Sequence, residues 1–289
     1  MLVALERVEP EGCECPHRCA RRSAQASRPP RRRRTRRCSG EAAANATRPA
    51  LAIPVLAQPG TPAPLGLAAP DVVYDEVGSS GAARLLALYQ SRDAAAVGPV
   101  DDTRPGDLRV LAVTEGLLAH GGGTRGVIME LDRSAVADLG RPGHPSGYAT
   151  RTGCAAPYNV FAATRLLYAE AAGDRHAPPA LFSYGGPGRP APQGTPRSRI
   201  TVRMPGQPSQ AWEYSPRTRI WHMASGPVPG LAVTNVVVQT VTYKPERIDK
   251  RHSINVAVVD GEGRQRWPLD ASSVVARGAS RDRRNSRTT

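Results

Sequence analysis

The sequence predicts an α+β fold, with a mixed sheet and helices in the N-terminal part and an antiparallel, β-rich C-terminal part. Strand-like and helix-like runs occur together before the Pro/Gly-rich residues 178–196, whereas only strand-like runs follow them. We therefore expect an N-terminal domain at 49–185, a linker at 186–198 and a β-rich domain at 199–263. The 289 residues give ample length to bury a core.

The basic charge of the chain is concentrated at its two ends. Of the net charge of +14, residues 1–48 carry +7, with twelve Arg and five Glu, and residues 264–289 carry +5, with seven Arg and two Asp. Neither end shows periodicity, so we expect a disordered basic leader at 1–48 and a disordered basic tail at 264–289. The remaining +2 gives no basic face for specific binding of nucleic acid.

Four of the five cysteines lie in the first 48 residues, where three of them form the run Cys-x-Cys-Pro-His-Arg-Cys. The run has thiol and imidazole groups that zinc binds, but it lacks the paired Cys-x-x-Cys of common structural sites. We predict no metal site and favour a disordered or wrongly translated leader over a zinc site. Cys154 stands alone, which is typical of a buried, inert thiol.

No run of about 18 apolar residues is present, so no segment is predicted to span a membrane. The arginines at 31–37 resemble the start of a secretion signal, but no apolar segment follows them. Cys38 would be the natural lipid-attachment site, yet Thr35-Arg36-Arg37 precede it where a lipobox needs small apolar residues. We find no recognisable signal peptide or lipobox, and we expect membrane contact only through a lipid anchor if the native start differs.

The first strand is predicted at residues 48–53, and a Pro/Gly-rich loop follows at 54–70. Two apolar runs, 72–77 and 85–89, flank a Gly/Ser segment, which predicts paired strands around a tight turn. Polar side chains on these strands would project from a stiff sheet. A binding pocket and a catalytic site both need such a platform.

A helix is predicted to begin at Pro105, because proline fits the first helical turn and Asp107 suits the positive end of the helix dipole. A short buried strand is expected at 117–120. Residues 140–156 are predicted to form a loop, and a helix is predicted at 161–172. Strands are then predicted at 200–204, 210–214, 218–222, 231–243 and 253–259.

The run Gly121-Gly122-Gly123-Thr124-Arg125-Gly126 satisfies G-x-G-x-x-G between a strand and a helix, where exposed N–H groups can hold an anion. A dinucleotide-binding fold also needs an acidic residue at the end of a second strand about 20 residues later. Asp138 comes too early, and residues 139–169 hold no acid. We predict a tight glycine turn and no cofactor, and binding of an anion to this turn stays open.

Several spaced motifs extend over residues 49–260. In chain order they are Asp71-Val72-Val73-Tyr74-Asp75, Gly81, Arg84, Gly98-Pro99-Val100, Arg104, Gly121-Gly122-Gly123, Pro157-Tyr158-Asn159-Val160-Phe161 and Asn235-Val236-Val237-Val238-Gln239. This series resembles the YerB-like group of bacterial envelope lipoproteins, a domain family whose activity is undetermined. Motifs in a fixed order are far more specific than one short pattern. The resemblance implies a location in the cell envelope, outside the cytoplasm.

The chain departs from the family pattern at polar positions. It has Ser79-Ser80-Gly81 in place of the usual Glu-Gly-Gly turn, Asp101-Asp102 in place of Arg-Ser, and Tyr158 in place of His. The Asp-Asn that usually lies near the first strand is missing from residues 53–60. If these family residues form a site, this copy has lost or rebuilt part of it.

The candidate ligand-binding site is assembled by the fold and not by one local motif. Arginines would fix an anionic group, a carboxylate would act as a base or bind a cation, and the glycine turn would donate N–H groups. The alternative is purely structural: Asp75 would pair with Arg84, Glu76 would face water, and Asn159 would cap a helix. The candidate residues are Tyr74, Asp75, Arg84, Arg104, His120, Gly122 and Asn159.

Two classes of function remain open at this stage. The first is an envelope-associated binding or accessory protein that recognises a small anionic or cell-wall-derived ligand. The second is a hydrolase that acts on a cell-envelope substrate through a carboxylate, either Asp75 or the pair Asp101 and Asp102. The sequence contains no Walker loop, H-E-x-x-H or G-x-S-x-G, so it assigns no catalytic residue. It does not set the oligomeric state.

Overall fold

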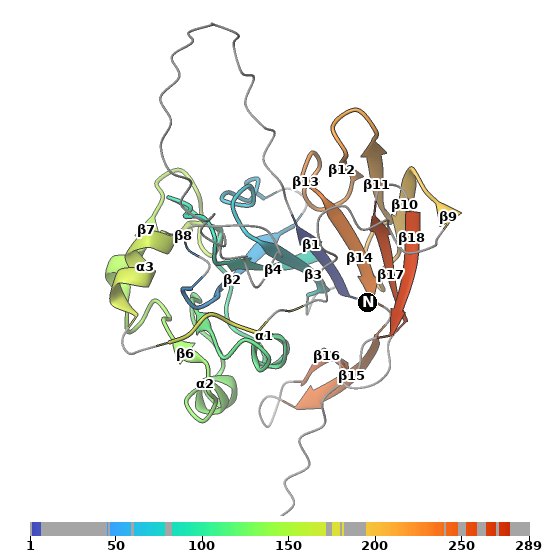
Figure 1. Cartoon of the computed structure of the whole chain (residues 1–289). Coiled ribbons are helices and arrows are strands. Elements are labelled where there is room, and N and C mark those ends of the chain that lie inside the picture. Colours follow the sequence, from blue (N-terminus) through green and yellow to red (C-terminus); the bar gives the residue numbers. More distant parts are fainter. Residues whose placement is uncertain are drawn as a thin grey trace, which may run out of the picture.

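The computed structural model describes residues 2–6, 45, 47–58, 61–78, 83–171, 175–179, 181, 195–239, 241–247, 253–258, 264–269 and 272–277. These residues have the predicted α+β fold, with three short α-helices and 18 strands among them. Figure 1 shows the helices on one side of the central strands and most of the C-terminal strands on the other.

Ten strands form one mixed sheet in the order β6-β5-β2-β4-β3-β1-β14-β17-β18-β9. The pairs β2–β5 and β5–β6 are parallel, and the other neighbouring strands in this sheet are antiparallel. The strands are β1 (Leu2–Glu6), β2 (Leu51–Ala57), β3 (Val72–Val77), β4 (Ala83–Tyr89), β5 (Leu117–Leu118), β6 (Ala137–Asp138), β9 (Thr195–Pro196), β14 (Asn235–Gln239), β17 (Arg264–Leu269) and β18 (Ser272–Arg277).

The predicted leader and tail each contribute strands to this sheet. β1 falls in the range predicted as a leader and pairs with β3 and β14, while β17 and β18 fall in the range predicted as a tail. Residues 7–44 and 278–289 lie outside the described residues, and so does the cysteine run of the leader. The predicted domain boundaries stay predictions.

The central strands β2, β3 and β4 alternate their side chains between two apolar layers, because successive residues of a strand face opposite sides. On one face, Leu86 and Leu88 pack against α1 (Pro105–Leu111) and α2 (Arg125–Leu131). None of the helices in the described part of the chain has the length and hydropathy that crossing a membrane requires. The helices α1 and α2 cover this face of the sheet, whereas Leu167 of α3 (Thr164–Glu170) packs in the core of the other face.

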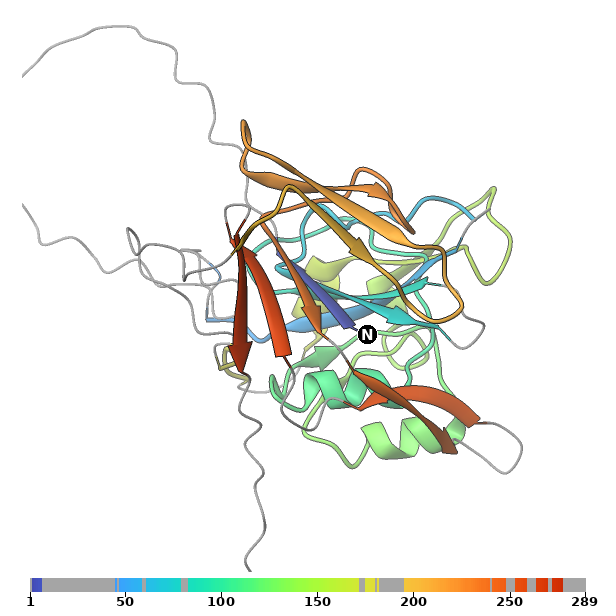
Figure 2. The ribbon, with the colours of Figure 1, turned by 90° about the vertical axis from the view of Figure 1, so that its right-hand side faces the viewer.

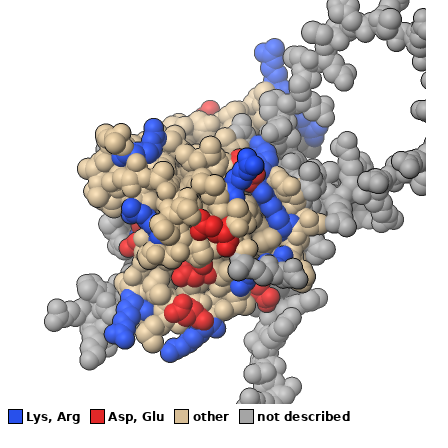
Figure 3. Space-filling model, turned by 90° about the vertical axis from the view of Figure 1, so that its left-hand side faces the viewer, with Lys and Arg blue, Asp and Glu red and all other residues tan. Residues whose placement is uncertain are grey.

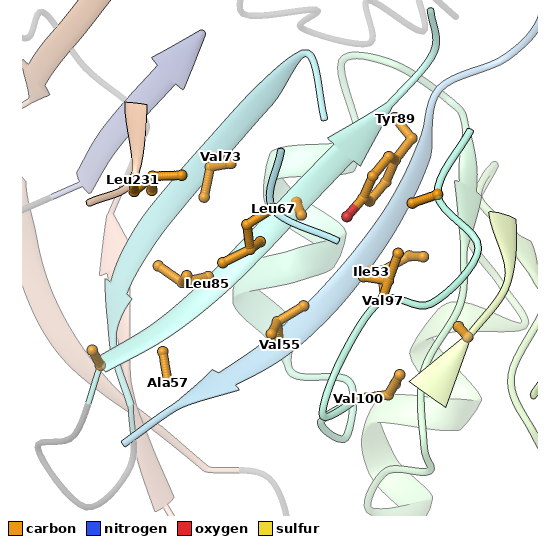
Figure 4. Close-up of a cluster of buried hydrophobic side chains, with 14 of the residues drawn as sticks. Ile53, Val55, Ala57, Leu67, Val73, Leu85, Tyr89, Val97, Val100 and Leu231 are labelled. Atoms are coloured by element: carbon orange, nitrogen blue, oxygen red, sulfur yellow. The ribbon is translucent and has the colours of Figure 1, made fainter. Parts of the chain in front are cut away.

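The other face of the central strands carries the larger core. Val73 and Leu85 lie near Leu231 at one end of this layer, and Ile53 lies near Val97 toward the other end (Figure 4). The same cluster includes the fully buried Trp212 of the C-terminal part. The two halves of the chain therefore share one hydrophobic core.

A second, antiparallel sheet of four strands supplies that C-terminal side of the core. Figure 2 shows it across the central strands from α1 and α2. Its strands are β10 (Arg199–Val202), β11 (Gln210–Ser215), β12 (Ile220–Ser225) and β13 (Ala232–Val233). The long strand predicted at 231–243 is wrong in its extent, because the chain there is divided between β13, β14 and the start of β15 (Thr242–Arg247), which pairs with β16 (Ser253–Val258).

The segment after β6 also differs from the prediction. The predicted loop at 140–156 contains a 3-10 turn (Pro145–Gly147) and β7 (Tyr148–Thr150), which pairs with β8 (Val160–Ala162). The predicted helix at 161–172 is shorter: α3 spans Thr164–Glu170, and Phe161 belongs to β8. Phe161 is held in a strand because β8 pairs with β7 and also with Val97.

Candidate functional site

Arg84 is the centre of a buried polar cluster at the helix-covered face of the sheet. Its Nε donates to Asp101 Oδ2 at 2.8 Å, and its Nη1 donates to Asp107 Oδ1 at 2.6 Å and Glu76 Oε2 at 3.4 Å. Its Nη2 donates to Asp107 Oδ2 at 2.7 Å and to the carbonyl of Asp102 at 2.9 Å. A guanidinium has five N–H groups, so every donor of Arg84 is used within the protein.

The β-hairpin and the start of α1 bring the charged groups together. Glu76 and Arg84 are directly opposite each other in the β3–β4 register. Asp107 occupies the third position of α1, where its Oδ2 accepts a hydrogen bond from the backbone N–H of Arg104 at 2.9 Å. An acidic side chain at this position satisfies a free backbone donor and suits the helix dipole. The local sequence of α1 thus fixes the main partner of Arg84.

The segment 97–103 carries the other two aspartates and is bonded on several sides. The N–H of Asp101 donates to Pro54 O, and its carbonyl accepts from the N–H of Gly121, each at 2.9 Å. The N–H of Thr103 donates to the carbonyl of Gly122 at 2.8 Å, and the N–H of Val100 donates to Val160 O at 2.9 Å. These bonds place the glycine turn beside Asp101 and Asp102.

Burial and neighbouring charges shift the pKa values of the groups in this cluster. Burial would lower the pKa of Arg84, but the carboxylates of Asp107, Asp101 and Glu76 raise it well above its ordinary value. Burial raises the pKa of Glu76 to about 7, Asp107 adds to this shift, and Arg84 opposes it. Arg84 is therefore a permanent charge, whereas Glu76 titrates near neutral pH.

Arg104 and Asp102 form the accessible edge of the cluster. Arg104 is 22% exposed, and its guanidinium donates from Nη2 to Asp101 Oδ2 at 3.0 Å. Within the described part of the chain its other guanidinium N–H groups have no acceptor. Burial and the charge of Arg84 lower the pKa of Arg104. Partial burial and the charge of Asp101 raise the pKa of Asp102, which is also open to solvent.

The glycine turn leaves room for the Asp102 carboxylate. A Cβ atom added at Gly122 would lie 3.0 Å from Asp102 Oδ1, closer than nearly all real contacts of a Cβ. The turn thus allows close approach of a side chain, as the predicted tight turn implies. The backbone of the turn is bonded to the neighbouring segment, because the N–H of Gly121 donates to Asp101 O and the carbonyl of Gly122 accepts from the N–H of Thr103.

His120 adds a buried imidazole next to this edge. Its Nε2 lies 2.9 Å from Asp138 Oδ1, and its backbone N–H donates to the hydroxyl of Tyr148 at 3.0 Å. Its Nδ1 is buried and has no hydrogen-bond partner among the described residues. The hydrogen bond from His120 lowers the pKa of Asp138. The imidazole ring is therefore held in place through its Nε2.

The structure brings together four of the seven predicted site residues, Arg84, Arg104, His120 and Gly122. Asp75 lies elsewhere: successive strand residues face opposite sides, so Glu76 meets Arg84 while Asp75 faces the four-stranded sheet and accepts a 2.7 Å bond from Gln210. The interpretation in which Asp75 pairs with Arg84 and Glu76 faces water is therefore wrong.

Tyr74 and Asn159 also lie apart from the cluster. Tyr74 is partly buried and packs against the helix-side core. Asn159 accepts a bond through its backbone carbonyl from Arg151 N–H at 2.8 Å, and α3 begins after Ala163, so Asn159 caps no helix. Tyr158, which replaces the family histidine, donates to Gln58 Oε1 at 3.2 Å. The turn at 79–82 lies outside the described residues.

Sequence reasoning missed Asp107 as a member of the cluster and Asp138 as the partner of His120. The sequence predicts Asp107 only as a residue of the helix start, and an acid on the inward side of the first helical turn is the signal that could identify it as a member of the cluster. Among the described residues no group of three or more His, Cys, Asp or Glu side chains has the arrangement of a metal site.

On the face shown in Figure 3, acidic side chains gather in the middle with basic ones around them.

Comparison with known proteins supports the predicted resemblance. Residues 37–177 match the model of the N-terminal domain of a protein of unknown function, DUF3048. The chain is similar in structure to the crystal structure of the YerB protein from Bacillus subtilis, with a TM-score of 0.63 and 16% identity, over 80% of this chain and 81% of that chain. No curated protein matched the sequence. The resemblance to the YerB-like family is confirmed, and at this identity the structural likeness shows the fold.

Proposed function

Because the chain carries a DUF3048 N-terminal domain and has the fold of a YerB protein, we propose that it is a binding or accessory protein of the bacterial cell envelope. Its ligand is a small anionic or cell-wall-derived molecule that contacts the edge formed by Arg104, Asp102 and Gly122. The envelope location follows the resemblance to YerB-like lipoproteins, and a lipid anchor is the expected membrane contact. Immunoblots of fractionated cells test this location, and recovery only in the cytosolic fraction would contradict it.

One observation carries the choice of binding residues: the two arginines of the cluster differ in their free donors. All five N–H groups of Arg84 are bonded inside the protein, whereas the guanidinium of Arg104 donates to one acceptor among the residues that the structure describes and is 22% exposed. Free donors on a charged planar group favour binding of a carboxylate or phosphate. Arg104, and not the central arginine, is therefore the anion-binding group.

The surrounding charge limits what such a ligand can be. Arg84 and Arg104 face four carboxyl groups, those of Glu76, Asp101, Asp102 and Asp107. A ligand with several negative charges would be repelled by this surplus, whereas one anionic group with hydroxyl or amide donors beside it would suit both Arg104 and Asp102. A cell-wall fragment with a single carboxylate fits this description better than a polyphosphate.

The test is calorimetric titration of the full chain with an N-acetylmuramyl peptide, compared with inorganic phosphate and with tripolyphosphate. We expect the muramyl peptide to bind and Arg104→Ala to weaken binding at least about tenfold, the scale of one charged hydrogen bond. Arg217→Ala, an exposed arginine in the turn between β11 and β12, is the matched control and should bind normally. Equal affinity of Arg104→Ala and the unchanged protein would overturn the proposal.

A hydrolase that acts through a carboxylate is the second candidate, and Asp102 is the residue that favours it. Asp102 is partly open to solvent, and its pKa is raised by its partial burial and by Asp101, as a general acid requires. Asp75 is fully buried on the other face and Asp101 is engaged by two arginines, so neither is available for this role. Hydrolysis of muramyl peptides that disappears in Asp102→Asn while binding persists would establish the enzyme.

A further inference from the structure

A buried carboxyl group and a buried amide join the two sheets of the molecule. Asp75 on β3 is 0% exposed and Gln210 at the start of β11 is 1% exposed. Gln210 Nε2 donates to Asp75 Oδ2 at 2.7 Å, across 135 positions of the chain. Both residues lie within the layer where the central sheet meets the four-stranded sheet, away from the Arg84 cluster.

Each partner of this pair has one oxygen without a hydrogen bond among the described residues. Asp75 Oδ1 and Gln210 Oε1 are buried and have no hydrogen-bond partner in the described part of the chain. Both oxygens are acceptors when Asp75 is ionised, so they cannot bond to each other. If Asp75 is protonated, its hydroxyl group can donate to Gln210 Oε1 while Gln210 Nε2 donates to the other carboxyl oxygen. A carboxylic acid and a primary amide are complementary in this way. Buried polar atoms without partners are costly, so the protonated pair is the better satisfied state.

Burial also favours the protonated form of Asp75. The pKa of Asp75 is raised to about 7, mainly by burial and less by the charge of Glu76, against the opposing effects of the bond from Gln210 and of the N-terminal amino group. From β4, Leu85 is opposite Asp75, and Arg84 is turned to the other face where it binds Asp107. From β11 the facing group is the uncharged Gln210. Asp75 thus has no close ion pair of its own among the described residues.

A second polar contact joins the same parts. Gln207 Nε2 donates to the backbone carbonyl of Glu76 at 3.3 Å. The residues just before and at the start of β11 are therefore bonded to two adjacent residues of β3. Loss of the Asp75 contact would weaken one of two polar anchors at this edge of the four-stranded sheet.

We propose that Asp75 and Gln210 form a pH-sensitive latch, in which the protonated carboxyl group holds the four-stranded sheet on β3 and the ionised carboxylate loosens it. The latch is independent of the proposed ligand site, because Asp75 faces the opposite side of the sheet from Arg84 and Arg104. At acidic pH the start of β11 is held, and above neutral pH it opens more often.

Hydrogen exchange of the full chain, corrected for the intrinsic pH dependence of exchange, tests the latch. Peptides that cover β11 should exchange on the order of tenfold faster at pH 8.5 than at pH 5.5, because ionisation of a carboxyl with a raised pKa favours the open state. Asp75→Asn keeps a group of the same size that cannot ionise, so its β11 peptides should exchange equally at the two pH values. A response in Asp75→Asn equal to that of the unchanged protein would overturn the proposal.

Glu76→Gln separates the latch from the Arg84 cluster. It removes the neighbouring titrating group and leaves Asp75 and Gln210 in place, so the pH response of β11 should persist. If the response disappears in this variant, it belongs to the cluster and the latch is refuted. The pKa of Asp75 can also be measured in the unchanged protein, by following the carboxyl ¹³C chemical shift of Asp75 with pH. A titration midpoint above about 5.5 supports the latch, and a midpoint close to the ordinary pKa of an aspartate refutes it.

Discussion

Arg84 and Asp107 form a buried bidentate ion pair, with Nη1 2.6 Å from Oδ1 and Nη2 2.7 Å from Oδ2. The exposed fraction of the Asp107 side chain is zero and that of the Arg84 side chain is 2%. Removing one partner of a buried pair leaves an uncompensated charge in a dry environment, which costs far more than the net value of the intact pair. This pair is the part of the cluster on which the local fold depends most.

Asp107→Asn should therefore reduce the free energy of unfolding by roughly 3–5 kcal/mol, as measured by urea denaturation. Asparagine keeps the shape but removes the charge that balances Arg84. Asp132→Asn, an exposed position just after α2, is the control and should change stability by less than about 0.5 kcal/mol. Similar effects of the two substitutions would mean that Arg84 is balanced by its other carboxylates alone.

Arg48, the last residue of the predicted leader, should be needed for stability. Its guanidinium donates hydrogen bonds to Gln90 O, Arg92 O and Asp93 Oδ1. The same group lies 3.9 Å from the centre of the Tyr168 ring. Lysine has neither the planar fork nor its stacking, so Arg48→Lys should cost roughly 1–2 kcal/mol in thermal unfolding. Arg199→Lys, in an exposed pair with Glu213, should be nearly neutral. Equal stability of both variants would count against this role.

Two glycines with nearly the same backbone conformation should respond differently to alanine. Gly66 has φ +84 and Gly153 has φ +85, so both substitutions strain the backbone by roughly 1–2 kcal/mol. At Gly66 the new Cβ would also lie 2.7 Å from the carbonyl of Ala96, whereas nothing lies within 4 Å at Gly153. Gly66→Ala should therefore lower the melting temperature clearly more than Gly153→Ala. Equal decreases in melting temperature for the two variants would mean that the backbone near Ala96 moves to make room for the new Cβ.

Stability should depend on pH through Glu76. Its pKa is about 7 in the folded protein and 4.5 as its ordinary value. Between these pH values the folded state binds more protons than the unfolded state, so the free energy of unfolding falls as pH rises. One such group contributes a slope of at most about 1.4 kcal/mol per pH unit. Glu76→Gln should remove this part of the slope in urea denaturation from pH 4.5 to 8, and an unchanged slope would contradict the shift.

The β3–β4 hairpin and the start of α1 could be predicted because their signals are local. Two apolar runs on either side of a Gly/Ser segment predicted both strands, and Pro105 with Asp107 predicted the helix start. The register was not predictable in the same way. It depends on how the strands are joined, and it decides that Glu76, and not Asp75, is opposite Arg84.

By itself the sequence determined the fold class, the family resemblance and most of the polar residues that gather near Arg84. Only the tertiary structure decided which of them meet, because the faces of a strand are assigned by packing against distant elements. Gln210 lies 135 residues from Asp75, and no local pattern connects them. Phe161 likewise has helical surroundings in the sequence but lies in a strand that pairs with Val97 and Tyr148–Thr150. Pairing and burial over such separations override local preference, since they contribute more free energy than propensity does.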